Sequence, residues 1–196
     1  MKTMLILGGD RIGRKAMESL QKSDSLVIVI DRSTSFKRVA KLIWKKRLSL
    51  ILILKMLLCE FRRDSPAVKS TAFTAFSEIK NNKGLLALLD KHKPERVVLF
   101  RAGLVIKKDV ISQGIPLFNI HCANVPDYGG LGSIDRALKD NALDQNATLH
   151  QVTTTIDEGH VFDVEPFRLN ASRSYCHNED VAYQAGLKLL RRTIGN

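Results

Sequence analysis

An amide and an imidazole, Asn119 and His121, stand two residues apart at the end of the apolar run Ile115 to Ile120. Alternate side chains of a strand point to the same face, so both groups would share one face at the strand's carboxyl end. An amide donor beside an imidazole can polarise a carbonyl and move a proton, as acyl transfer requires. Alone, such a pair is more often a hydrogen-bonded structural histidine. The next residue, Cys122, would point to the opposite face, which favours a buried, reduced cysteine over a Cys–His dyad.

The elements that must hold this pair are typical of a parallel α/β sheet. Met4 to Leu7 reads as a first strand, ends in two glycines and precedes a helical pattern, and the continuous run Leu26 to Ile30 reads as a second buried strand. This order predicts one domain over residues 1–196, with a doubly wound, mostly parallel, Rossmann-like sheet. Further strands are expected at Arg96–Phe100, Ile115–Ile120, Thr148–Ile156 and Val161–Leu169, and helices at Arg11–Leu20, Leu85–Leu89, Ala137–Leu143 and Glu179–Ile194.

The turn between the first strand and the first helix is a second candidate site. Glycines there allow a phosphate to approach the backbone, and a helix N-terminus favours its negative charge. The segment is neither a Walker A loop nor a G-x-G-x-x-G turn. Asp31 ends the second strand, about where dinucleotide-binding folds place their ribose acid, so an oxidoreductase is a rival interpretation. A tight turn and a phosphate site stay equally open for these residues, which are Gly8, Gly9, Asp10, Arg11, Ile12 and Gly13.

The chain is basic, with a formal net charge of +11, which indicates an acidic partner such as phosphate, nucleic acid or an anionic membrane. The insert Phe36 to Asp64 alone holds nine basic and two acidic residues, interleaved with Trp44 and the apolar run Leu50 to Leu54. This pattern is a candidate for peripheral membrane contact. The alternative, which we favour, is a pair of surface helices on the sheet, with their charges in water and with core residues at Leu50, Leu52 and Ile53.

The cysteines are Cys59, Cys122 and Cys176, an odd number without metal-ligand spacing. We therefore expect no disulfide framework, no metal site and a reducing cytoplasm. The N-terminal apolar run is too short for a signal peptide, and Leu48 to Cys59 is too short to span a bilayer.

Three further motifs follow the Asn-x-His pair in order: Val125-Pro126-x-Tyr128-x-Gly130, Thr148-x-His150 and Asp157-x-Gly159. Together the four motifs resemble the 10-formyltetrahydrofolate-dependent formyltransferases, a family that acts on glycinamide ribonucleotide, methionyl-tRNA and amino sugars. The resemblance is firm over residues 96–169. It implies a formyltransferase fold and transfer of a formyl group to a primary amine.

The resemblance also implies roles for the motif residues. Asn119 would hold the formyl oxygen, His121 would stabilise that oxygen or take the proton of the amine, and Asp157 would orient His121 and relay protons. His150 would support these three. Backbone groups would cradle the pterin of the co-substrate 10-formyltetrahydrofolate, from Arg101, Ala102, Gly103, Leu104 and Val105 on one loop and from Thr154, Thr155 and Ile156 on another. Gly8 to Gly13 and Tyr128 would face the acceptor.

The sequence departs from the family pattern at Gly129, Ser133 and Asn146, where relatives carry Arg, Pro and Gly. These changes leave the three catalytic positions intact. We expect a small phosphorylated or nucleotide-linked acceptor, with an amino sugar favoured. Glycinamide ribonucleotide, or a catalytically silent membrane-binding protein of the same fold, are the alternatives. The chain ends at Asn196 without the extra domain that grips tRNA in relatives, so no tRNA partner is expected.

Overall fold

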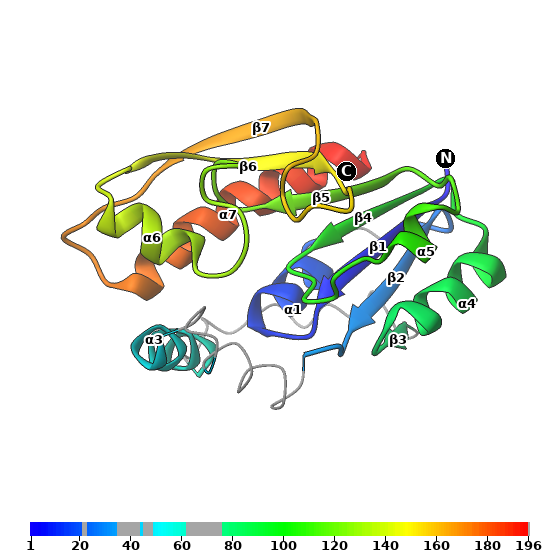
Figure 1. The fold of residues 1–196 in the computed structure, drawn as a ribbon, viewed down its shortest axis with the longest axis horizontal. Coiled ribbons are helices and arrows are strands. Elements are labelled where there is room, and N and C mark those ends of the chain that lie inside the picture. Colours follow the sequence, from blue (N-terminus) through cyan, green and yellow to red (C-terminus); the bar gives the residue numbers. More distant parts are fainter. Residues whose placement is uncertain (21–22, 35–43, 45–48, 62–75, 196) are drawn as a thin grey trace.

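The computed structural model describes residues 1–20, 23–34, 44, 49–61 and 76–195. Within these residues, seven strands form one sheet in the order β3-β2-β1-β4-β5-β6-β7 (Figure 1). All neighbours from β3 to β5 pair in parallel, whereas β6 is antiparallel to both β5 and β7. The predicted mostly parallel α/β sheet is therefore confirmed. The strands are β1 (Thr3–Gly8), β2 (Leu26–Asp31), β3 (Ser77–Ile79), β4 (Arg96–Phe100), β5 (Leu117–His121), β6 (Asp144–Gln151) and β7 (Val161–Arg168).

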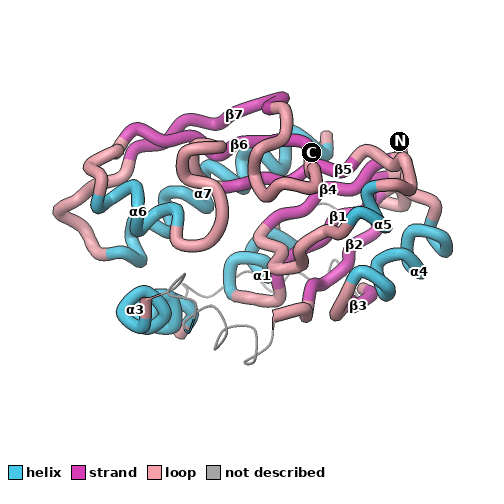
Figure 2. Tube along the Cα trace, viewed as in Figure 1, coloured by secondary structure: helices cyan, strands magenta, loops and turns pink. Residues whose placement is uncertain are grey.

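Both faces of the sheet are covered, which explains why its central strands are continuous apolar runs. On β1, Leu5 and Leu7 enter one core, and Met4 and Ile6 enter the core on the opposite face. The first core is closed by α1 (Arg11–Glu18), α6 (Ser133–Lys139) and α7 (Tyr175–Ile194), and the second by α4 (Asn82–His92) and α5 (Lys108–Ile111) (Figure 2).

The strand expected at Thr148–Ile156 is displaced towards the N-terminus. It begins at Asp144 and ends at Gln151, which lies opposite Phe118 on β5. The chain must then turn to return as β7, so the threonine-rich stretch forms a loop. α6 also begins earlier than predicted, after Gly132 turns the chain with a φ of 73°. β3 and α5 are too short to leave a periodic pattern, and neither was predicted.

Part of the predicted insert forms helix α3 (Leu50–Glu60), which is capped by the Ser49 hydroxyl. Residues 35–43, 45–48 and 62–75 lie outside the described residues. α3 does not lie on the sheet but stands beside α1, α6 and α7 (Figure 1). Leu52 is buried, Ile53 is half-buried and Leu50 is 69% exposed, so the expected burial of Leu50 is wrong. No described helix is long and apolar enough to cross a membrane.

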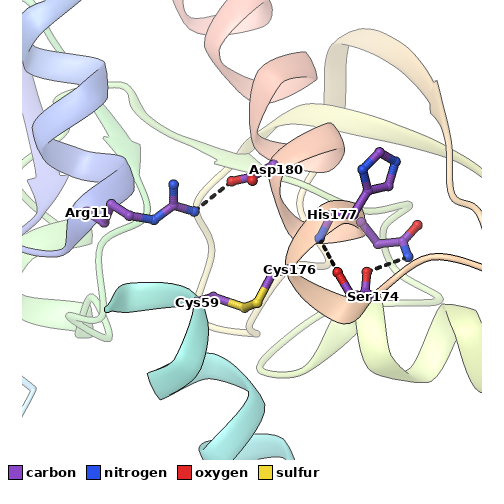
Figure 3. Close-up of a disulfide and its surroundings, with 7 residues drawn as sticks. Arg11, Cys59, Ser174, Cys176, His177 and Asp180 are labelled. Carbon is purple, nitrogen blue, oxygen red and sulfur yellow. Dashed lines mark hydrogen bonds and ion pairs between the residues drawn. A yellow bond between two sulfur atoms is a disulfide. The ribbon is translucent and has the colours of Figure 1, made fainter. Parts of the chain in front are cut away.

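A disulfide joins Cys59 at the end of α3 to Cys176 in the first turn of α7 (Figure 3). The expectation of no disulfide is therefore wrong. The two cysteines are 117 residues apart, and only the packing of α3 against α7 brings them together. Cys122 is free and buried, as predicted.

Candidate active site

Strands β5 and β6 place four polar side chains on one face of the sheet. Asn119 pairs with His150 across the antiparallel ladder, and His121 pairs with Thr148. Because side chains alternate along a strand, the intervening Ile120 enters the core of the opposite face. The amide Nδ2 of Asn119 lies 3.1 Å from Nε2 of His150. The Asn-x-His and Thr-x-His motifs thus meet as neighbours across two strands.

Asp157, on the loop after β6, supplies the carboxylate at the centre of this group. Its Oδ1 lies 3.3 Å from the Asn119 amide and 3.3 Å from Nε2 of His150. Its Oδ2 lies 3.5 Å from Nδ1 of His121 and accepts a hydrogen bond of 2.7 Å from the Gly130 N–H. The structure therefore brings Asn119, His121 and Asp157 together around one carboxylate, with His150 beside them.

The environment sets the protonation states of the two central groups. Burial alone would raise the pKa of Asp157, but hydrogen bonding from His150, the neighbouring His121 and the Gly130 N–H together lower it to about 2. Burial lowers the pKa of His121, and the attraction of Asp157 offsets this only in part. At neutral pH the site thus holds a carboxylate beside a neutral imidazole, which is able to accept a proton.

Comparison with known proteins shows the family of this chain. The family profile described as "Formyl transferase" matches residues 18–180. The chain belongs to the formyltransferase family. The predicted family is thereby confirmed.

Among curated relatives, a methionyl-tRNA formyltransferase of Fervidobacterium nodosum is 22% identical over 121 residues, or 62% of this chain and 39% of the relative. The matched region is thus well under half of that relative. A phosphoribosylglycinamide formyltransferase structure from Anaplasma phagocytophilum superposes with a TM-score of 0.67 at 12% identity, covering 100% of this chain and 85% of the other. The sugar 3N-formyltransferase WlaRD, solved with dTDP and 5-N-formyltetrahydrofolate, superposes with a TM-score of 0.58 at 16% identity. The match covers 100% of this chain and 62% of WlaRD.

In this family member, the departure at Gly129 has a steric reason. Asp157 adopts a left-handed φ of 56°, which Asp tolerates better than most residues and which turns its carboxylate towards β5. A Cβ at position 129 would lie 3.0 Å from the Cβ of Asp157, a tight approach. Glycine at 129 therefore allows the loop to pass close to the acid.

Arg136 is a residue of the site that was not predicted from the sequence. From α6, its guanidinium donates to the carbonyl oxygens of Gly129 and Leu131 and holds the loop that also offers its Gly130 N–H to Asp157. No motif or spacing distinguishes this arginine from others in the chain.

Tyr128, predicted to face the acceptor, presents its main-chain oxygen to Nε2 of His121 at 2.9 Å.

The loop predicted to cradle the pterin begins with an inward-turned arginine. Arg101 has a φ of 63°, and its guanidinium stacks over the Tyr183 ring and lies 2.7 Å from the Asp10 carboxylate. Its side chain is thus engaged with α7 and the β1–α1 turn. The second predicted loop has exposed side chains at Thr154, Thr155 and Ile156.

Asp31 anchors the first of these loops. Its two oxygens accept hydrogen bonds of 2.7 Å from the N–H groups of Ser33 and Leu104, and its side chain is buried. A ribose would have to compete with both main-chain donors for this carboxylate. The geometry therefore gives the oxidoreductase interpretation no free ribose acid at Asp31.

The Gly8 to Gly13 turn already holds protein carboxylates. The Asp10 carboxylate accepts a hydrogen bond of 2.9 Å from the Gly13 N–H. Both carboxylate oxygens of Glu60 on α3 lie 2.9 Å from the main-chain nitrogen of Arg11. The Arg11 guanidinium is buried and pairs with Asp180 at 2.6 Å (Figure 3). An acceptor phosphate at this helix terminus would therefore have to displace Glu60. Glu60 lies 49 residues from Arg11, so local spacing could not have revealed the contact.

Proposed function

We propose that this protein transfers a formyl group from 10-formyltetrahydrofolate to the primary amine of a small phosphorylated or nucleotide-linked acceptor, with an amino sugar favoured. The observation that carries the proposal is the contact of Asp157 with both Asn119 and His121. Acyl transfer needs a proton acceptor and a hydrogen-bond donor to the developing oxyanion. The neutral imidazole, supported by the carboxylate, can be the first, and the amide can be the second.

Each group has one task in this proposal. Asn119 donates a hydrogen bond to the formyl oxygen as the acceptor nitrogen bonds to the formyl carbon. His121 takes the proton that the amine loses, and Asp157 stabilises the resulting imidazolium. The proton then passes to the folate nitrogen as its bond to the formyl carbon breaks, so that charge and atoms balance. His150 keeps Asp157 and Asn119 in place through its contacts with both.

Two observations support a small anionic acceptor. The net charge of +11 favours an acidic ligand, and the β1–α1 turn offers the Arg11 N–H and the Arg14 guanidinium to a carboxylate, Glu60, in the position where a phosphate could bind. Among similar structures, WlaRD was solved with a nucleotide and a folate. Glycinamide ribonucleotide is the second candidate, because structures with that activity share the fold.

The test is a transfer assay with 10-formyltetrahydrofolate and a panel of nucleotide-linked amino sugars, glycinamide ribonucleotide and charged initiator tRNA. We expect formylated product with one small acceptor, detected by mass spectrometry, and a loss of at least ~10²-fold in rate for Asn119→Ala. Calorimetry with a stable 10-formylfolate analogue tests co-substrate binding separately. Transfer to tRNA alone would overturn the acceptor, and absence of folate binding would overturn the proposed activity.

A further inference from the structure

Helix α3 presents a continuous apolar stripe to solvent. The exposed side chains recur at intervals of one, three and four residues along α3 and the residue that follows it, so they lie along one side of the helix. Their exposed fractions range from 50% to 82%. They are Leu50, Ile51, Leu54, Leu57, Leu58 and Phe61.

The opposite side of α3 is fastened to the rest of the molecule. Leu52 packs close to Gly132, and the Lys55 ammonium lies 2.8 Å from Asp135 on α6. Cys59 forms the disulfide to α7, and Glu60 lies on the N-terminus of α1 (Figure 3 shows the disulfide). These contacts fix the rotation of the helix about its axis. The apolar stripe therefore cannot turn inward without breaking a covalent bond and two polar contacts.

Positive charge flanks this stripe in the sequence. Lys45, Lys46 and Arg47 precede the helix, and Arg62 and Arg63 follow it directly after Phe61. The segment 36–64 carries a net charge of +7, whereas the single lysine within α3 is paired with Asp135. Trp44, an aromatic side chain suited to a membrane–water interface, is 81% exposed.

We propose that α3 docks on an anionic lipid surface, with its axis in the plane of the interface and the apolar stripe inserted among the acyl chains. A bilayer of this kind supplies both an apolar layer for the stripe and negative charge for the flanking lysines and arginines. A second copy of this chain would instead bring two segments of the same strong positive charge together. Charge complementarity therefore favours lipid over self-association.

Docking through α3 would also bring the candidate active site to the lipid surface. Gly132, which packs close to Leu52, belongs to the same loop as Gly130, whose N–H binds the Asp157 carboxylate. One short loop thus links the fastened side of α3, opposite the stripe, to the acid. The proposal concerns where the protein works and is independent of which acceptor it uses.

Co-sedimentation with vesicles tests the proposal. The full chain is mixed with vesicles of phosphatidylcholine alone or of phosphatidylcholine and phosphatidylglycerol, at low and high salt. We expect binding at least about tenfold tighter to the anionic vesicles, and loss of that preference at high salt. The double variant Leu54→Glu/Leu58→Glu should weaken binding by at least about tenfold, because it places two charges in the stripe.

Two controls keep the result interpretable. Val164→Glu adds a charge at an exposed apolar position on β7, outside the stripe, and should leave vesicle binding unchanged. Circular dichroism and a free-thiol count show whether each variant is folded with its disulfide intact. Absence of binding to anionic vesicles, or binding that the double variant does not weaken, would overturn the proposal. So would a dimer in sedimentation velocity that the double variant dissociates, because the stripe would then be a protein interface.

Discussion

Two of the carboxylates that accept a main-chain N–H, Asp157 and Glu60, differ in their surroundings. Asp157 accepts from Gly130 and is otherwise bordered by two imidazoles and an amide, with only 10% of its side chain exposed. Glu60 accepts from Arg11 and pairs with the guanidinium of Arg14, with 34% of its side chain exposed. The His121 imidazole beside Asp157 can exchange a proton, whereas an arginine stays charged. One carboxylate is thus suited to chemistry and the other to neutralising charge.

The largest effect should come from the covalent link that holds Glu60 beside α1. Replacing both partners in Cys59→Ser/Cys176→Ser should lower the free energy of unfolding by about 2–5 kcal/mol, because a bridge across so long a loop restricts the unfolded chain strongly. Urea unfolding, followed by circular dichroism, measures this change in the free energy of unfolding. Reductant should destabilise the wild-type protein and leave the double variant unaffected. Equal stability of both proteins without reductant would show that the bridge does not hold the fold.

Asp157→Asn tests the carboxylate of the candidate active site. The amide keeps the size of the side chain but cannot stabilise a charged His121, so the transfer rate should fall by ~10²-fold or more while folate binding persists. Steady-state kinetics and calorimetry separate the two effects. Asp24→Asn, at an exposed aspartate before β2, is the matched control and should retain full activity. An unimpaired Asp157→Asn rate would remove this residue from the mechanism.

Glu60→Gln tests the other carboxylate. Removing its charge should raise the affinity of the β1–α1 turn for inorganic phosphate by up to about tenfold, because an anion at a helix N-terminus no longer competes with a like charge. Phosphate titration followed by NMR shifts of the Arg11 and Gly13 amides measures this. The control is Glu78→Gln, at an exposed glutamate paired with Arg32, and it should leave the phosphate affinity unchanged. Unchanged affinity would mean that phosphate does not bind at this turn.

The smallest effect is a shift in pH dependence. Because the pKa of His121 lies below its ordinary value, the imidazole stays neutral at neutral pH, and the rate should fall only as the pH drops through that lowered pKa. The charge of Asp157 raises the pKa of His121, so Asp157→Asn should move the titration to still lower pH. NMR titration of the His121 ring measures the shift even where activity is lost. A titration that moves upward would contradict the assigned electrostatics.

Part of the site around Asp157 was predictable from local rules. Strand alternation alone places Asn119 and His121 on one face, whereas the antiparallel pairing of β6 that sets His150 opposite Asn119 comes from the tertiary structure. That Asp157 would lie beside these residues could be predicted only from the ordered family motifs. Arg136 escaped prediction because a helix-borne arginine that binds two loop carbonyls leaves no spacing signal.

The residue pattern reveals the buried strands, the order of the central strands and helices along the chain and the polar face of β5, because period and burial are local properties. What lies at the β1–α1 turn and which way α3 faces depend on tertiary packing. The Cys59–Cys176 bridge and the contact of Glu60 with Arg11 join residues far apart in the chain. Such pairings depend on how helices pack in space, and no periodic pattern records that packing. The same packing buries Leu52 but leaves Leu50 exposed, although both were predicted to lie in the core.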